Sequence, residues 1–162
     1  MFKLLKSEAK GFTLVELVVI IVVLGILAAV AIPRLFDVSE EAEKASVETM
    51  VSSLESALGI YASKQFVGAQ PIAVHNPFED LSNIPSNYKG INDPVTIANT
   101  PDGYWSWRPS GNWIMYNPRQ QITGGWLNGG ERFIIFRVEP VVDGGDTVGI
   151  RLNTTPAYAY TW

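Results

Sequence analysis

A nearly uninterrupted apolar segment occupies residues 12–32 and constrains this chain more than any other feature. Among its 21 residues only Thr13 and Glu16 have polar side chains. At about 1.5 Å of rise per residue, a helix of this length reaches roughly 32 Å, close to the roughly 30 Å hydrocarbon core of a bilayer. We therefore expect one membrane-spanning helix, and a total length of 162 residues leaves room for one small domain.

The segment before the apolar run is short, mostly polar and basic. It carries Lys3, Lys6 and Lys10 against Glu8. Positive charge beside an apolar segment holds that end of the chain in the cytoplasm. The predicted topology therefore has a cytoplasmic amino terminus and a domain on the opposite side of the membrane.

Two simpler membrane signals are alternatives for this segment. A secretory signal has an apolar run of only about 7 to 15 residues and a small-residue cleavage site. The small residues at the end of the run, Ala28, Ala29 and Ala31, imitate such a site. A plain signal anchor fits the length better, but neither alternative explains Glu16.

Glu16 is an ionisable residue in an apolar helix, where such a group is costly and is by default a functional candidate with a partner. If the chain were cut between Gly11 and Phe12, the new amino terminus would be a cation about one helical turn from this carboxylate. The pair could form within one subunit or between two. We expect the pair between subunits.

The residues from Gly11 to Leu17, with sequence GFTLVEL, resemble the prepilin signature of type IV pilins and type II secretion pseudopilins. A basic leader, a glycine, a phenylalanine, a glutamate five residues into the mature chain, and Pro33 at the end of the apolar run all agree with a class III-type prepilin signal. Residues 33–39 and the small-residue-rich helix after them look most like the mannose-sensitive hemagglutinin branch.

The resemblance implies how the amino terminus is processed. In that family a membrane-embedded aspartyl peptidase cuts after the glycine, here Gly11, and methylates the new amino terminus, here Phe12. By resemblance, Glu16 sets subunit register during assembly, and Gly25 and Pro33 bracket a stretch of helix that loosens in the filament. The alternative is an ordinary glycine and proline, which membrane helices tolerate.

The pattern becomes amphipathic after Pro33. Apolar residues recur at three- and four-residue spacing, which predicts a stripe packed against the domain: Val47, Met50, Val51, Leu54, Ala57, Leu58 and Tyr61. We expect one helix over residues 12–64. The acidic run of Glu40, Glu41 and Glu43 is interpreted as a solvated helix face, or as a charged collar that meets Arg34 or Lys44 of a neighbouring subunit.

Composition changes sharply after residue 64. Nine of the ten prolines, eleven of the fourteen glycines and fourteen of the eighteen aromatic residues lie there, which indicates short strands and loops. We expect strands at residues 105–108, 112–117, 131–138, 147–152 and 157–162, and turns at 76–81 and 85–90. The predicted fold class is α+β and type IV pilin-like, with an antiparallel sheet packed on the long helix. The predicted divisions are a leader (1–11), an assembly helix (12–33), its amphipathic continuation (34–64) and a head (65–162).

Two features of the head have competing interpretations. Alternation places two sets of aromatic side chains each on one face of a strand: Trp105 with Trp107, and Tyr158 with Tyr160 and Trp162. These side chains are interpreted either as core packing or as a stacking platform for a glycan. Asp143 and Asp146 flank two glycines and are weak calcium candidates, but two carboxylates do not fill calcium's six to eight ligand positions. Hairpin turn chemistry explains them equally well.

Composition argues against several other classes of function. Twelve basic against sixteen acidic residues argue against nucleic acid as the main partner. There is no cysteine, and the single histidine, His75, is expected in a loop or on the surface and has no second histidine with which to share a metal. Because no phosphate loop, nucleophile elbow or metal-ligand array appears, we expect a non-catalytic protein without a cofactor.

The most favoured function is therefore a structural subunit of a type IV pilus or pilus-like fibre. Its expected partners are copies of itself or other pilins, the prepilin peptidase and methyltransferase, the inner-membrane assembly platform and the lipid bilayer. Its expected location is the bacterial inner membrane and then the fibre. The alternatives are a type II secretion pseudopilin that forms a periplasmic pseudopilus and, below it, a membrane-anchored glycan- or DNA-binding minor pilin.

Overall fold

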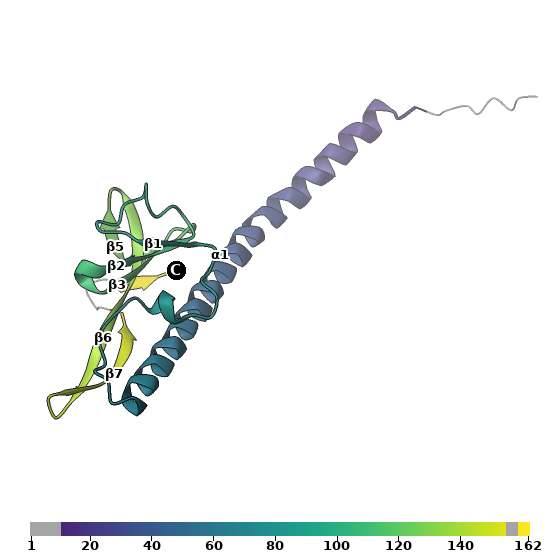
Figure 1. Ribbon diagram of the computed structural model, residues 1–162. Coiled ribbons are helices and arrows are strands. Elements are labelled where there is room, and N and C mark those ends of the chain that lie inside the picture. The colour runs from purple at the N-terminus through teal and green to yellow at the C-terminus, as the bar shows by residue number, and fades with distance from the viewer. Residues whose placement is uncertain (1–10, 155–158) are drawn as a thin grey trace, which may run out of the picture. The chain divides into compact units, whose positions relative to one another are not determined.

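The computed structural model describes residues 11–154 and 159–162 (Figure 1). The chain divides into two compact units, Met1–Ser39 and Glu40–Trp162. Helix α1 (Leu14–Val67) begins in the first unit and ends in the second. Residues 1–10 of the predicted leader (1–11), and residues 155–158, which include Tyr158, lie outside the described residues.

Helix α1 has 54 residues and is continuous through Pro33. It ends in a left-handed turn at Ala69, whose φ is 50°. The N–H of Ala69 donates to the carbonyl of Phe66, and that of Gln70 to the carbonyl of Gln65, as in a Schellman motif. The prediction of one long helix is confirmed, although the helix starts two residues later and ends three residues later than expected.

The second half of α1 buries one stripe within the second unit. Val47, Leu54 and Leu58 are fully buried, and Met50 and Val51 pack beside them. These residues join the main hydrophobic core with side chains from the sheet. The predicted stripe is therefore confirmed, and the helix supplies one wall of the core.

The larger sheet has six strands. Its order is β1 (Tyr88–Ile91), β2 (Tyr104–Arg108), β3 (Trp113–Asn117), β6 (Glu131–Asp143) and β5 (Trp126–Asn128), with β7 (Asp146–Asn153) paired to β6. Strands β4 (Thr123–Gly124) and β8 (Tyr160–Thr161) form a separate two-stranded sheet. Two short 3₁₀ helices, η1 (Pro77–Asp80) and η2 (Pro109–Gly111), lie in the connections. The α+β prediction is confirmed.

Alternation along the strands gives the sheet two apolar faces. Trp105, Ile114 and Phe136 belong to the core that contains the helix stripe. Residues that alternate with these along the same strands, such as Met115 next to Ile114 and Ile135 next to Phe136, form a second cluster on the other face. Both faces are covered, which explains why the central strands are rich in large apolar residues.

The sheet is not wholly antiparallel. Strand β1 pairs with β2 in parallel, with Tyr88 beside Trp105 and Ile91 beside Trp107, whereas the other pairs are antiparallel. The predicted turn at 85–90 is wrong in its second half, because Tyr88–Ile91 forms this short edge strand. The sequence does not predict strands β4 and β5, because both are short and the glycine pair Gly124–Gly125 ends one strand and separates it from the next.

Strand β6 extends five residues beyond its predicted end. The N–H of Val138 donates to the carbonyl of Asn112, so the nitrogen of Pro140, two residues later, faces the same edge of the strand. Strand β3 is paired with β6 only as far as Arg137, so that edge is open at Pro140. The missing N–H of the proline therefore interrupts no ladder hydrogen bond. Figure 1 shows the resulting β6–β7 hairpin extending past the other strands.

Candidate functional site

The carboxylate of Glu16 closes the first turn of α1. Its Oε2 accepts hydrogen bonds from the backbone N–H of Thr13, at 2.9 Å, and from Thr13 Oγ1, also at 2.9 Å. Thr13 Oγ1 in turn accepts from the N–H of Glu16 at 3.2 Å. This is a capping box, which satisfies two donors that a helix start leaves without partners. The spacing Thr-x-x-Glu could have predicted it.

The side chains around Glu16 are apolar and exposed. Phe12 is 84% exposed, and Leu14 and Val15 are similarly open. By length and composition, α1 contains a segment apolar enough to cross a membrane, and none of its most apolar window is buried within the protein. A surface of this kind requires an apolar environment, from lipid or from other protein chains.

Gly25 and Pro33 both lie within the regular helix. A Cβ at Gly25 would meet nothing within 4 Å, so this subunit alone does not require a glycine there. Pro33 has no N–H, so the carbonyl of Ala29 receives no helical hydrogen bond from it. These two residues remain candidates for assembly, and the helix has no break at either of them.

The amino-terminal segment matches a protein-family model. Residues 6–32 match the prokaryotic N-terminal methylation motif. This is the motif of prepilins. The matched residues include Lys10, Gly11, Phe12 and Glu16, and the predicted resemblance to the prepilin motif is confirmed.

The similarity extends to type IV pilins and pseudopilins. The chain is 46% identical over 53 residues to the type IV narrow pilus major component PilA5 of Thermus thermophilus, covering 33% of this chain and 46% of that protein. It is 28% identical over 116 residues to the type II secretion system core protein G of Klebsiella michiganensis, covering 67% of this chain and 70% of that protein. It is 40% identical over 55 residues to the type II secretion system core protein G of Escherichia coli, covering 34% of this chain and 38% of that protein. No solved structure matches the chain significantly.

Coverage differs among these relatives. The chain spans less than half the length of PilA5 and of the E. coli protein, whereas it spans more than two thirds of the Klebsiella protein. The shorter matches cover about one third of this chain.

A second cluster joins α1 to the loop after β3. Glu43 is buried, and its Oε1 accepts from Tyr116 Oη at 2.6 Å and from the N–H of Arg119 at 2.8 Å. Its Oε2 accepts from the N–H of Gln120 at 2.9 Å. Burial and the hydrogen bond to Glu43 raise the pKa of Tyr116 well above its ordinary value of about 10. Both interpretations of Glu43 from the sequence are wrong, because it lies neither on a solvated face nor in a collar.

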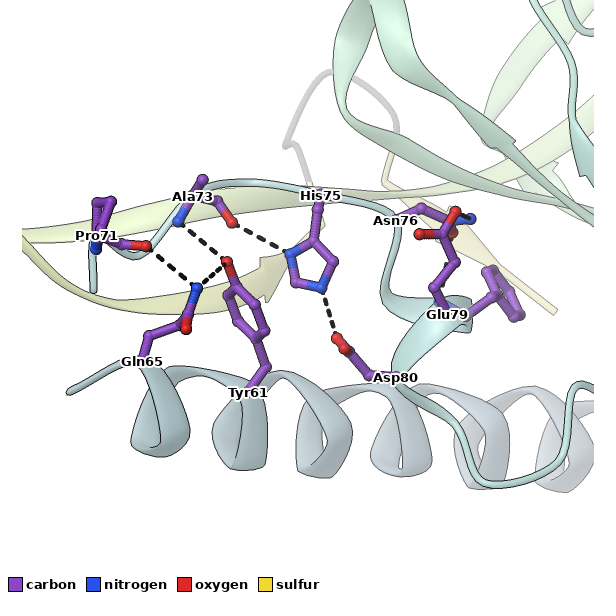
Figure 2. A network of polar contacts seen from close by, with 9 residues as sticks. Tyr61, Gln65, Pro71, Ala73, His75, Asn76, Glu79 and Asp80 are labelled. Atoms are coloured by element: carbon purple, nitrogen blue, oxygen red, sulfur yellow. Dashed lines mark hydrogen bonds and ion pairs between the residues drawn. The ribbon is translucent and has the colours of Figure 1, made fainter. Parts of the chain in front are cut away.

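His75 lies in the segment between α1 and η1, as the sequence indicated, and it has defined partners there. Figure 2 shows its ring between Ala73 and Asp80, beside Tyr61 of the helix. Its Nε2 lies 2.6 Å from Asp80 Oδ2, its Nδ1 lies 3.1 Å from the Ala73 carbonyl, and the Tyr61 ring is 4.0 Å away between centroids. The contact with Tyr61 links the connecting segment to the helix, whereas the contact with Asp80 links it to η1.

The aromatic residues of the central strands belong to the core. Trp105 and Trp107 are 2% and 4% exposed, so they offer no stacking platform to a glycan. Tyr160 and Trp162 are half-buried and pack against the same core. Core packing, the first interpretation of these residues, is confirmed.

Asp143 and Asp146 face each other at the end of the β6–β7 hairpin. Gly144 and Gly145, between them, have φ values of 59° and 94°, which is the backbone of a type I′ turn. Hairpin geometry thus accounts for the Asp-Gly-Gly-Asp sequence. Across the described ranges 11–154 and 159–162, no group of three or more metal-ligating side chains forms.

Proposed function

We propose that this protein is a structural subunit of a type IV pilus or pilus-like fibre, made as a membrane-inserted prepilin. The observation that carries the proposal is Glu16, an acidic side chain in an exposed apolar helix, four residues after Phe12 and inside a prepilin motif. The proposed role needs no catalytic site. In this proposal the chain is the substrate of the peptidase that processes it.

Processing takes place at the Gly11–Phe12 bond. A peptidase must approach the backbone there, and a glycine permits that approach because it has no side chain. A Cβ at Gly11 would meet nothing within 4 Å in this subunit, so the requirement would come from the peptidase. Cleavage followed by methylation of Phe12 leaves the apolar helix attached to the mature chain, which carries nine basic and fifteen acidic residues, a formal charge of −6.

Assembly then uses the carboxylate of Glu16. In a single subunit the capping box with Thr13 satisfies this carboxylate. In the fibre, the charged amino group of Phe12 from a neighbouring subunit supplies the opposite charge that a carboxylate in apolar surroundings requires. Apolar side chains around the pair exclude water, and the pairing sets the register between helices.

The proposed location follows from the helix and the charge before it. The amino terminus is cytoplasmic, the helix spans the inner membrane and the head lies in the periplasm until the subunit enters the fibre. Partners are other copies or other pilins, the prepilin peptidase and the assembly platform. Gly25 and Pro33 allow the helix between them to loosen during packing.

A type II secretion pseudopilin is the second candidate. It is favoured by the similarity to core protein G of Klebsiella michiganensis, which extends beyond the helix to 116 residues. The two candidates differ in the final location of the fibre, at the cell surface or in the periplasm. Sheared surface fibres that contain this protein would support the pilus, whereas fibres confined to the periplasm would support the pseudopilus.

Fibre assembly by a Glu16→Gln variant tests the proposal. Asp143→Asn is a matched control, because it also removes one negative charge but lies in the exposed hairpin turn. We expect Glu16→Gln to insert in the membrane at the normal level and to lose fibres, and Asp143→Asn to assemble normally. Normal fibres from Glu16→Gln would exclude the assembly role of the carboxylate.

A further inference from the structure

A polar hollow of about 440 Å³ lies between the loop after β3 and the start of β6. Asp102, Arg119, Gln120, Gln121 and Arg132 contribute most of its polar lining. We call it the arginine pocket. None of these residues belongs to the prepilin motif, and the proposed function does not use them.

Both arginines of the pocket lie close to backbone, and Arg132 is hydrogen-bonded to it. Arg132 Nη1 donates to the carbonyl of Gly124 at 2.8 Å. The guanidinium of Arg119 lies against Gly103, where a Cβ would come within 2.5 Å of its Nε. Glu43 fixes the backbone of the same loop through the N–H of Arg119. The Arg132 guanidinium and the backbone at Arg119 are thus positioned before any partner arrives, which lowers the entropy cost of binding an anion.

The side chains that line the pocket include two cations, Arg119 and Arg132, and one anion, Asp102. Arg108, Arg137 and Arg151 form ion pairs with carboxylates, whereas among the described residues Arg119 and Arg132 form none. Asp102 also lines the pocket, but its Oδ1 accepts a hydrogen bond from Asn117 Nδ2 at 3.0 Å. The lining side chains therefore carry a net positive charge, and the Glu43 carboxylate is engaged by the backbone N–H groups of Arg119 and Gln120 in the same loop.

The opposite charge lies on the exposed face of α1. Glu41, Glu48 and Glu55 are exposed and recur every seven residues, so they lie in one stripe, each about 10 Å along the helix from the next. In the part of the chain that the structure describes, none of the three forms an ion pair. We call them the acidic stripe.

The surface around Glu48 permits close approach. Glu48 lies in a shallow groove with Ala45, Ser52 and Ser56, whose side chains are small. The hydroxyl of Ser52 donates to the carbonyl of Glu48, and that of Ser56 to the carbonyl of Ser52. Because these hydroxyls already donate within the helix, another surface can cover them with less loss of hydrogen bonding.

We propose that the arginine pocket of one copy binds the acidic stripe of a second copy, with the Glu48 carboxylate between the guanidiniums of Arg119 and Arg132. The inference rests on the proposed function, since a fibre brings many copies side by side. In the proposed fibre, neighbouring subunits are then joined in two ways: by packing of their apolar helical segments and by this charged contact of the head. Arginine forks suit carboxylates because they offer paired N–H donors in one plane.

Cysteine cross-linking in assembled fibres tests the contact, because the chain has no cysteine of its own. Gln121→Cys in the pocket and Ser52→Cys beside Glu48 keep every charged group of the contact. A short bismaleimide should join these two positions between copies. Ser52→Cys with Val142→Cys, an exposed position in the β6–β7 hairpin, is the control pair. We expect the first pair to cross-link at least about tenfold more than the control.

Charge reversal in the first cysteine pair gives the second readout. Arg132→Glu should lower the cross-link at least about fivefold, and adding Glu48→Arg should restore it, since the charges are again opposite. Equal cross-linking of the control pair, or no effect of Arg132→Glu, would overturn the inference. Fibres without the cross-link would overturn only this contact, whereas an unmodified chain that forms no fibres would overturn the proposed function as well.

Discussion

The hydroxyl of Tyr116 lies 2.6 Å from the Oε1 of Glu43, a residue 73 positions earlier in the chain. This hydrogen bond joins the helix to the central strand β3 across the main core. The two N–H groups of the following loop bind the same carboxylate. The helix is therefore attached to the sheet by a satisfied polar cluster as well as by its apolar stripe.

Replacement of Glu43 should destabilise the second unit. Glu43→Ala leaves the Tyr116 hydroxyl and the N–H groups of Arg119 and Gln120 without their acceptor, so we expect a loss of about 2–4 kcal/mol in the free energy of unfolding. Urea unfolding of the detergent-solubilised full chain measures it. Glu41→Ala, on the exposed side of the helix, is the control and should change stability by less than about 0.5 kcal/mol. Equal effects of the two changes would contradict the role given to Glu43.

Stability should fall at alkaline pH because of Tyr116. Its pKa is raised in the folded protein by burial and by the hydrogen bond to Glu43. The unfolded chain therefore loses this proton first, and the stabilisation, fully present below the ordinary tyrosine pKa of about 10, is lost as pH rises above it. Urea midpoints between pH 9 and 11 measure the slope.

The variant Tyr116→Phe should have a shallower slope over the same pH range. It will not abolish the slope, because burial also raises the pKa of Tyr88 and of Tyr160. An unchanged slope in Tyr116→Phe would show that this hydroxyl does not couple folding to pH.

The turn that ends α1 should accept glycine with a gain in stability. Ala69 has a φ of 50°, a left-handed conformation that costs a residue with a Cβ roughly 1–2 kcal/mol. Glycine avoids this strain but orders a more flexible chain, so we expect Ala69→Gly to stabilise by about 0.5–1 kcal/mol. Thermal unfolding of the full chain in detergent measures the change.

The same substitution inside the helix provides a control of opposite sign. Ala42 is exposed in the middle of α1, and Ala42→Gly should destabilise by about 0.5–1 kcal/mol. If Ala69→Gly and Ala42→Gly changed the thermal stability in the same direction, the left-handed turn at Ala69 would be contradicted.

Sequence patterns predicted the parts of the fold that depend on local periodicity. The apolar run and the stripe of Val47, Leu54 and Leu58 identified the long helix, because a spacing of three and four residues is a property of one helix alone. The prepilin motif was likewise contiguous, so Gly11, Phe12 and Glu16 could be identified together.

Features that depend on distant residues were not predictable in the same way. Nothing near Glu43 in the sequence indicates that Tyr116 and the loop after β3 present donors to it. The parallel pairing of β1 depends on where β2 lies, and the extension of β6 past Pro140 depends on an edge that β3 leaves open. These outcomes are decided by tertiary pairing, which a pattern of single residues does not contain.

The mass of the amino-terminal peptide from membrane-extracted protein tests the central claim most directly. Cells with an active prepilin peptidase and cells without it should be compared. With the peptidase, we expect loss of residues 1–11 and one added methyl group on Phe12; without it, the leader should remain. An intact, unmethylated amino terminus in cells with active peptidase would contradict the prepilin assignment.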